Sequence, residues 1–160
     1  MRIPSALAAA ALVASPVVAS AQAQQAVRIT SQVQAVKEVT DAQGRKTRTL
    51  VEPTTVIPGT PLVIWVRYAN SGRAPANNFV INNPVNPSID FTAFGENSGW
   101  GLVSVDGGKT FGALATLKVA RADKTLRAAL PADVTHVRWT FPRAIAPGAS
   151  GTLSFCAVVK

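Results

Sequence analysis

The chain is poor in the residues that build metal centres and disulfides. Its 160 residues include a single Cys, a single His and a single Met. A structural zinc site takes four Cys or His ligands, and an intrachain disulfide takes two Cys. The sequence therefore excludes a multi-cysteine zinc site, a disulfide framework and a histidine-rich metal centre.

Charged residues are also scarce, at 15% of the chain against roughly 25% in an average soluble protein. The hydrophobic fraction of 48% is enough for a core, and the length suits one domain of about 100–200 residues. Lys and Arg outnumber Asp and Glu by 16 to 8, giving a formal net charge of +8. The basic residues are scattered, without an aromatic-interleaved nucleic-acid motif. We therefore expect no nucleic-acid partner, and weak attraction to anionic envelope surfaces.

Residues 1–23 have the organisation of a signal peptide. Arg2 supplies a positive start, residues 6–18 form an apolar run, and small residues alternate over 19–23 in the Ala-x-Ala pattern of signal peptidase sites. A membrane-spanning helix needs about 20 apolar residues, and Pro16 interrupts this run; an uncleaved anchor is the alternative. The sequence thus predicts an exported protein, periplasmic or secreted. Its mature part, residues 24–160, is expected to be one domain with no transmembrane segment.

Apolar and polar residues alternate with a period of two along much of the mature part, which is typical of half-buried strands. Residues 24–52 contain two such stretches around a turn at 41–44, and predict a long, charged hairpin that forms a sheet edge or a partly detached arm. The run 62–68 is almost continuously apolar. It predicts a central strand covered on both faces, with Trp65 in the core.

The rest of the chain also reads as short strands separated by turns. Residues 114–122 fit a strand better than a short helix, and 118–130, ended by Pro131, is the one stretch with helical character. Turns recur every 8–12 residues or so, as in β-sandwiches. The sequence predicts an all-β sandwich of about eight to ten strands, the later ones at 77–82, 89–93, 102–105, 109–111, 134–141 and 152–159.

An ordered set of short motifs over residues 56–160 resembles the bacterial conserved-repeat domain of unknown function. They are Pro58-Gly59, Tyr68-Ala69-Asn70-Ser71-Gly72, Ala76-Asn77-Asn78, Val137-Arg138-Trp139, Ala146-Pro147-Gly148 and Gly151-Thr152-Leu153-Ser154-Phe155. Residues 83–87 carry Asn where that family usually has Asp, and this chain has one copy of a domain that often occurs in tandem in surface proteins. The resemblance implies an immunoglobulin-like β-sandwich, outside the cytoplasm and without known enzymatic activity.

Residues 104–111, Ser-Val-Asp-Gly-Gly-Lys-Thr-Phe, are similar to the Asp-box of sialidases and related β-propellers, where the motif shapes a surface hairpin and is not catalytic. A propeller needs several blades of about 40–50 residues, so only the hairpin interpretation fits this length. Asp106 is expected to fix the turn by accepting backbone N–H bonds, Gly107 and Gly108 to take positive φ, and Phe111 to return the chain to the core. The predicted hairpin residues are Ser104, Asp106, Gly108, Thr110 and Phe111.

Residues with catalytic or metal-binding chemistry are few. His136 faces away from the apolar side of its strand, and no nucleophile-elbow motif accompanies it. Asp90 and Glu96 flank a loop, but a glycosidase needs its two carboxyl groups about 5–10 Å apart. A calcium loop could use the oxygen-rich segment 82–90, yet turn chemistry explains the Asn and Pro residues there. We expect no enzyme activity, metal or cofactor.

Two further side chains bear on partners. Cys156 alternates away from the apolar face of the last strand, so it is expected to be a free thiol or to link two chains in a Cys156 dimer. Trp100, in the loop 95–101, is expected either to plug the end of the sandwich or, with Asn97, to contact a ligand; Trp139 is expected in the core.

The predicted function is a non-enzymatic immunoglobulin-like module with a structural or interaction role in the bacterial envelope. Its expected partner is a protein or glycan of that envelope. The alternative is a secreted carbohydrate- or ligand-binding module that uses Trp100 and Asn97.

Overall fold

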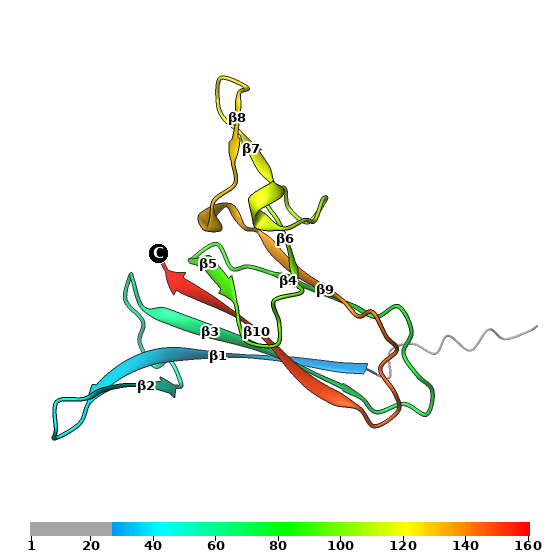
Figure 1. Cartoon of the computed structure of the whole chain (residues 1–160), viewed down its shortest axis with the longest axis horizontal. Helices are drawn as coiled ribbons and strands as arrows, with labels where there is room; N and C mark the ends of the chain where they lie inside the picture. The colour runs from blue at the N-terminus through cyan, green and yellow to red at the C-terminus, as the bar shows by residue number, and fades with distance from the viewer. Residues whose placement is uncertain (1–26) are drawn as a thin grey trace, which may run out of the picture.

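The computed structural model describes residues 27–160 (Figure 1), and the expected signal peptide, 1–23, lies outside them. The described part is all-β, as predicted, with two short 3-10 helices, and none of its helical segments is long and apolar enough to cross a membrane. The elements are β1 (Val27–Thr40), β2 (Lys46–Val51), β3 (Pro61–Asn70), β4 (Val80–Pro84), β5 (Ile89–Phe94), β6 (Leu102–Ser104), η1 (Leu114–Thr116), β7 (Lys118–Ala120), β8 (Leu126–Ala128), η2 (Pro131–Asp133), β9 (His136–Thr140) and β10 (Ser150–Val159).

The strands form three antiparallel sheets. The largest has five strands in the order β2-β1-β3-β10-β5, the second has the order β4-β9-β6, and β7 and β8 form a separate two-stranded ribbon. The last strand in the sequence, β10, lies in the interior of the five-stranded sheet and pairs with β3 on one side and β5 on the other. The chain therefore passes between the sheets several times, which brings distant segments together.

The core lies between the five-stranded and the three-stranded sheets. Trp139 of β9 is fully buried, and its ring packs edge-on against Phe94 at a centroid distance of 5.6 Å. Its indole N–H donates to the backbone oxygen of Ser98 at 3.0 Å, so this polar group is satisfied inside the core. The burial of Trp139 confirms its predicted place.

The prediction that residues 62–68 are covered on both faces, with Trp65 in the core, is wrong. Along β3, Leu62, Ile64 and Val66 are buried, whereas Val63 and Trp65 between them are half-buried. The indole N–H of Trp65 donates to the side-chain oxygen of Gln34 at 2.8 Å, on the face turned away from the core. A continuous apolar run suits a doubly covered strand, but here it places the half-buried Val63 and Trp65 on the outer face.

The segment 118–130 forms no helix. It folds as the β7–β8 hairpin, and the predicted strand at 114–122 is present only as β7, preceded by η1. The turn is fixed by Asp123, whose carboxylate accepts bonds from the N–H and hydroxyl of Thr125 at 3.0 and 2.6 Å, while Lys124 has φ of 66°. Local side-chain bonding of this kind competes with helix formation.

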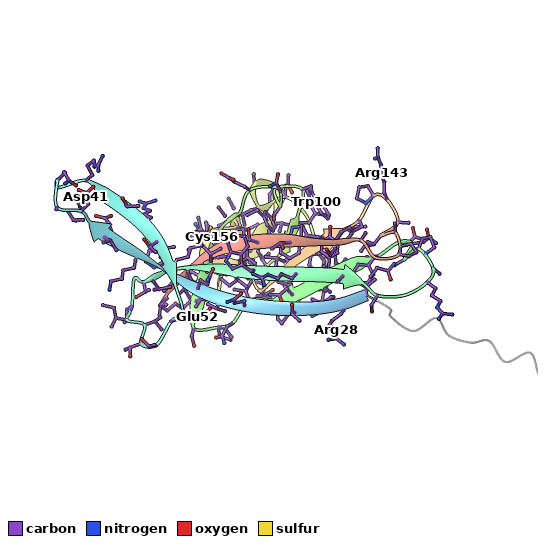
Figure 2. All side chains as sticks on the ribbon, turned by 90° about the horizontal axis from the view of Figure 1, so that it is seen from below. Arg28, Asp41, Glu52, Trp100, Arg143 and Cys156 are labelled. Atoms are coloured by element: carbon purple, nitrogen blue, oxygen red, sulfur yellow. The ribbon has the colours of Figure 1, made fainter. Side chains whose placement is uncertain are left out.

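The β1–β2 hairpin extends beyond the rest of its sheet. β1 pairs with β3 from Val27 to Ala35 and with β2 from Ala35 to Thr40, so residues 36–51 overhang the end of β3. We call residues 36–51 the arm (Figures 1 and 2). At its tip, Asp41 accepts the N–H groups of Gln43 and Arg45 at 2.9 and 2.8 Å, which holds the turn.

A buried asparagine joins the loop after β3 to the loop before β10. Asn70 is 1% exposed, and its side-chain nitrogen donates to the backbone oxygens of Ala74 and Ile145 at 3.0 and 2.8 Å. Its side-chain oxygen accepts the N–H of Gly72 at 3.0 Å. The Asn-Ser-Gly motif thus acts as a clamp between two loops at one end of the molecule.

Candidate functional site

The Asp-box-like segment is a loop organised around one carboxylate. Asp106 accepts the hydroxyls of Ser104 and Thr110, both at 2.7 Å, and the N–H groups of Lys109 and Thr110 at 3.1 and 3.0 Å. The N–H of Gly108 donates to the hydroxyl of Ser104 at 2.9 Å. These bonds, those from Thr110 foremost, hold the pKa of Asp106 well below its ordinary value. Asp106 is therefore an ionised acceptor within the loop and a poor general base.

The predicted strand at 109–111 is absent, and the expectation that Phe111 enters the core is wrong. The loop closes through a single bridge between Val103 and Gly112, whose N–H and carbonyl groups pair at 3.0 Å in both directions. Phe111 is half-buried at the surface of the three-stranded sheet, where the guanidinium carbon of Arg138 lies 3.5 Å from its ring centroid. The chain pairs with Val103 again only at Gly112, so Phe111 stays outside the core. The guanidinium of Arg138 covers the Phe111 ring in a cation–π contact.

His136 packs beside this loop. Its ring is near Gly108, where an added Cβ would lie 3.4 Å from the ring, and its Nδ1 is 3.2 Å from the Thr135 hydroxyl. His136 and Cys156 lie on the outer sides of different sheets. Packed sheets are about 10 Å apart, so these two side chains cannot form a Cys–His pair.

Asp90 and Glu96 are separated by most of β5. Asp90 lies on β5, where its carboxylate is 3.2 Å from the Lys160 amine in an ion pair without hydrogen-bond geometry, and Glu96 follows the end of that strand. The extended backbone from Asp90 to Phe94 alone covers about 13 Å. Among residues 27–160, no three His, Cys, Asp or Glu side chains gather as a metal site.

Trp100 and Asn97 lie at different surfaces of the molecule. Trp100 is 43% exposed, its ring packs edge-on against Phe141 at 5.3 Å, and its indole N–H donates to the backbone oxygen of Asn97 at 3.2 Å. Phe141 in turn contacts Tyr68 and Phe79, so Trp100 covers an aromatic cluster. This geometry fits the predicted plug. The side of the loop that carries Asn97 borders a hollow near Trp65 instead.

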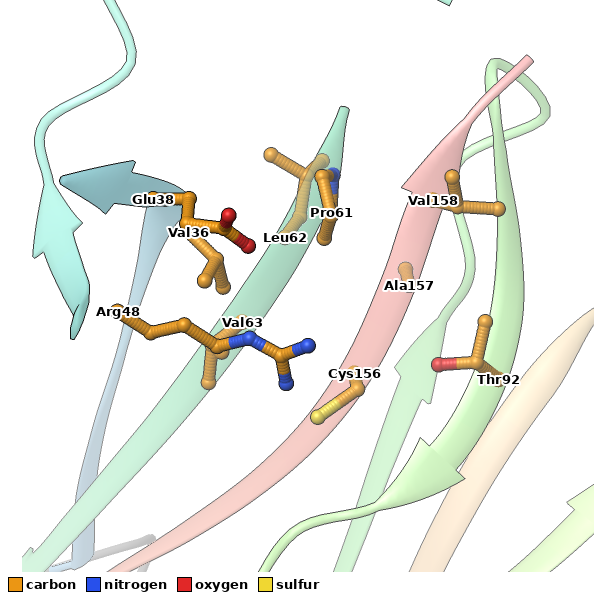
Figure 3. A pocket seen from close by; sticks show the side chains of 10 residues that line it. All are labelled: Val36, Glu38, Arg48, Pro61, Leu62, Val63, Thr92, Cys156, Ala157 and Val158. Carbon is orange, nitrogen blue, oxygen red and sulfur yellow. The ribbon is translucent and has the colours of Figure 1, made fainter. Parts of the chain in front are cut away.

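The face of the five-stranded sheet that points away from the core, here called the outer face, is hollowed along its length. Beneath the arm lies a groove of about 700 Å³ (Figure 3), which we call the arm groove. The β1–β2 hairpin, β3, β10 and β5 all contribute to this groove, and most of its lining is apolar. The lining residues are Val36, Glu38, Arg48, Pro61, Leu62, Val63, Thr92, Cys156, Ala157 and Val158.

Two smaller hollows continue the arm groove along the outer face. The middle hollow, of about 440 Å³, shares Val63 and Cys156 with the arm groove and adds Trp65, Glu96 and Asn97. The last, of about 260 Å³, adjoins the middle one at Thr152 and is basic, with Arg28 and Arg67 among its lining. The outer face therefore changes from apolar to aromatic to basic along the sheet.

Cys156 lies half-buried in the floor shared by the first two hollows. Burial raises the pKa of its thiol, so the thiolate that forms disulfides is disfavoured. The recessed position and the raised pKa both favour a free thiol. A Cys156-linked dimer stays a prediction to which the structure lends no support.

Sequence reasoning missed the outer face because it assigned the apolar residues of 62–68 to the core. One signal was present: Gln32 and Gln34 alternate on β1 opposite Trp65 and Val63. Polar partners directly across from an aromatic residue indicate a face that is only partly covered.

Comparison with known protein families gives no match, and comparisons with curated proteins and with solved structures give none either. The likeness to the conserved-repeat domain therefore rests on the sequence motifs alone.

Proposed function

We propose that this chain is an exported, non-enzymatic immunoglobulin-like module that binds a component of the bacterial envelope through the outer face of its five-stranded sheet. The observation that carries the proposal is the row of three adjoining hollows on that face. Exposed apolar surface of this kind marks interaction sites. Export is supported by the signal-peptide organisation of residues 1–23.

The state of the polar side chains supports binding over catalysis. Asp41, Asp106, Asp123 and Asp133 each accept local hydrogen bonds that lower their pKa, which suits turn-fixing and ion-pairing roles. A general base needs a pKa near the working pH and a position within hydrogen-bond reach of its substrate. His136 instead packs on the Asp-box-like loop.

A second candidate is glycan binding in the middle hollow. The sequence-based alternative placed a ligand on Trp100 and Asn97, but only Asn97 borders the outer face. Trp65 is the half-buried aromatic ring in that hollow, with Glu96 and Asn97 beside it. An aromatic ring flanked by polar groups suits a sugar, whose apolar face stacks while its hydroxyls bond.

Cosedimentation with an envelope preparation from the producing bacterium tests the proposal. Val63→Arg places a charge in the floor that the first two hollows share, whereas Leu126→Arg places the same charge on the exposed β8. We expect Val63→Arg to lose most of the bound fraction and Leu126→Arg to retain it, with both variants folded by circular dichroism. Equal binding of the two variants would overturn the role of the outer face.

A further inference from the structure

Arg48 reaches over the arm groove without a partner. It points from β2 toward the floor made by Val63 and Cys156 (Figure 3), and within residues 27–160 its guanidinium makes no hydrogen bond or ion pair. A guanidinium presents five donors in a planar fork that matches a carboxylate. The groove thus has an anion-binding group at its rim that nothing in the described chain occupies.

The neighbouring acid does not cancel this charge. Glu38 lies directly across from Arg48 in the β1–β2 register, but its carboxylate pairs with the amine of Lys46 at 2.7 Å. Lys46, which lies outside the groove lining, thus balances the charge of Glu38, and Arg48 keeps an unpaired positive charge at the rim. Arg48 would therefore attract an incoming anion, because the charge of Glu38 is already neutralised by Lys46.

The floor below Arg48 suits a hydrocarbon chain. Val36, Val63 and Val158 present aliphatic groups there, and Cys156 presents a neutral thiol because burial raises its pKa. The volume of about 700 Å³ falls within the range of about 300–1,000 Å³ of small-molecule sites. Covering this floor with an acyl chain removes apolar area from water on both partners.

We propose that the arm groove binds an amphiphilic carboxylate, a molecule with an acyl chain and one carboxylate head. The chain lies on the floor formed by Val63, Cys156 and Val158, and the head pairs with Arg48. Charge complementarity at the rim selects an acid over a neutral or cationic amphiphile. This inference rests on the proposed function, since it names a ligand class for one part of the outer face.

The single cysteine provides the test, because a ligand on the floor shields Cys156 from N-ethylmaleimide. Dodecanoate below its micelle concentration is compared with dodecanol and with dodecyltrimethylammonium, and affinities are measured by calorimetry. We expect dodecanoate to slow the labelling of Cys156 and to bind at least about tenfold more tightly than either of the other two.

Arg48→Gln should weaken dodecanoate binding by about tenfold, while leaving dodecanol binding unchanged. Arg143→Gln is the matched control, because Arg143 is an exposed arginine at the far end of the molecule from the arm (Figure 2). Both side chains are exposed, so neither substitution should alter folding, and melting curves verify this.

The inference is overturned if dodecanol protects Cys156 as well as dodecanoate does, if dodecyltrimethylammonium binds more tightly, or if Arg48→Gln has no effect. Absence of protection by all three amphiphiles also overturns it. The proposed function is judged separately by the Val63→Arg cosedimentation. An envelope interaction that depends on Val63 without dodecanoate binding would reject the ligand class and keep the binding face.

Discussion

The indole of Trp65 and the amide of Gln34 are joined across β3 and β1 by a hydrogen bond of 2.8 Å. The bond anchors an aromatic ring on the outer face, where water reaches part of it. Trp139, by contrast, is enclosed between the two sheets and bonds to a loop carbonyl. The two tryptophans therefore differ in what their removal should do to stability.

Trp139→Ala should lower the free energy of unfolding by about 3–5 kcal/mol, the usual cost of deleting a buried large aromatic side chain. Trp65→Ala should cost clearly less, because its ring is half-buried and leaves no enclosed cavity. Urea unfolding of both variants measures the difference. Equal costs would mean that Trp65 belongs to the core after all.

Removal of the Asn70 clamp should be strongly destabilising. Asn70→Ala removes the partner of the Gly72 N–H and of the Ala74 carbonyl. It also removes one of the two bonds to the Ile145 carbonyl, which still accepts the N–H of Ala76 at 2.9 Å. A buried polar group left without a partner costs about 1–3 kcal/mol. We expect a total loss of about 2–4 kcal/mol, because water can replace some of these bonds. Asn77→Ala, at an exposed position, is the control and should change stability by less than about 0.5 kcal/mol.

Two glycines of the loop 95–101 should respond differently to the same substitution. A Cβ on Gly101 would lie 2.5 Å from the ring of Phe94 and 2.7 Å from the indole nitrogen of Trp139, whereas a Cβ on Gly99 would meet nothing within 4 Å. Gly101→Ala should therefore cost about 1–3 kcal/mol through overpacking. Gly99→Ala should be close to neutral, and thermal melting of the pair settles the comparison.

The Asp-box-like loop should show a defined pH dependence. Hydrogen bonds from Thr110 and Ser104 lower the pKa of Asp106 in the folded state. Its contribution to stability is therefore fully present above the unfolded pKa of about 3.9 and is lost as the pH falls through the lower folded pKa. Asp106→Asn should lower the melting temperature by a few degrees at neutral pH, with a difference that shrinks in acid. A difference that stays constant down to about pH 2 would contradict this account.

Export can be tested on the protein itself. Cleavage at either Ala-x-Ala site removes the first 21 or 23 residues, so material from the periplasm or the medium should have one of the two corresponding intact masses. The full-length chain recovered from the cytoplasm would contradict export. The combined variant Ala19→Arg, Ala21→Arg and Ala23→Arg is the control, because it removes the small residues that the peptidase requires.

The sequence predicted the fold best where one face of a strand is buried and the other is exposed to solvent. Val137 and Trp139 alternate with His136 and Arg138 along β9, and this period of two survives in the structure because the core covers only one side. The turn at Gly107 and Gly108 was also visible, since both residues have positive φ. These features are set by local chemistry.

The misses have a common physical origin in contacts between distant segments. Whether Val63 and Trp65 are covered depends on whether another layer lies over β3, and the apolar run alone does not carry that information. The place of Phe111 depends on how many residues the loop takes before it rejoins Val103. In the same way, the sequence alone does not indicate that Trp100 packs on Phe141 while Asn97 borders the middle hollow.

The interior position of β10 has a consequence for the timing of folding. Until residues 150–159 have been synthesised, β3 lacks a strand on one side and β5 lacks its sheet partner. Pairing over such long sequence separations forms late. We expect the nascent chain to stay open until β10 emerges, which suits the proposed export because a translocation channel accepts an unfolded polypeptide. A chain ended before Ser150 should accordingly be digested rapidly by proteases to which the chain through β10 is resistant.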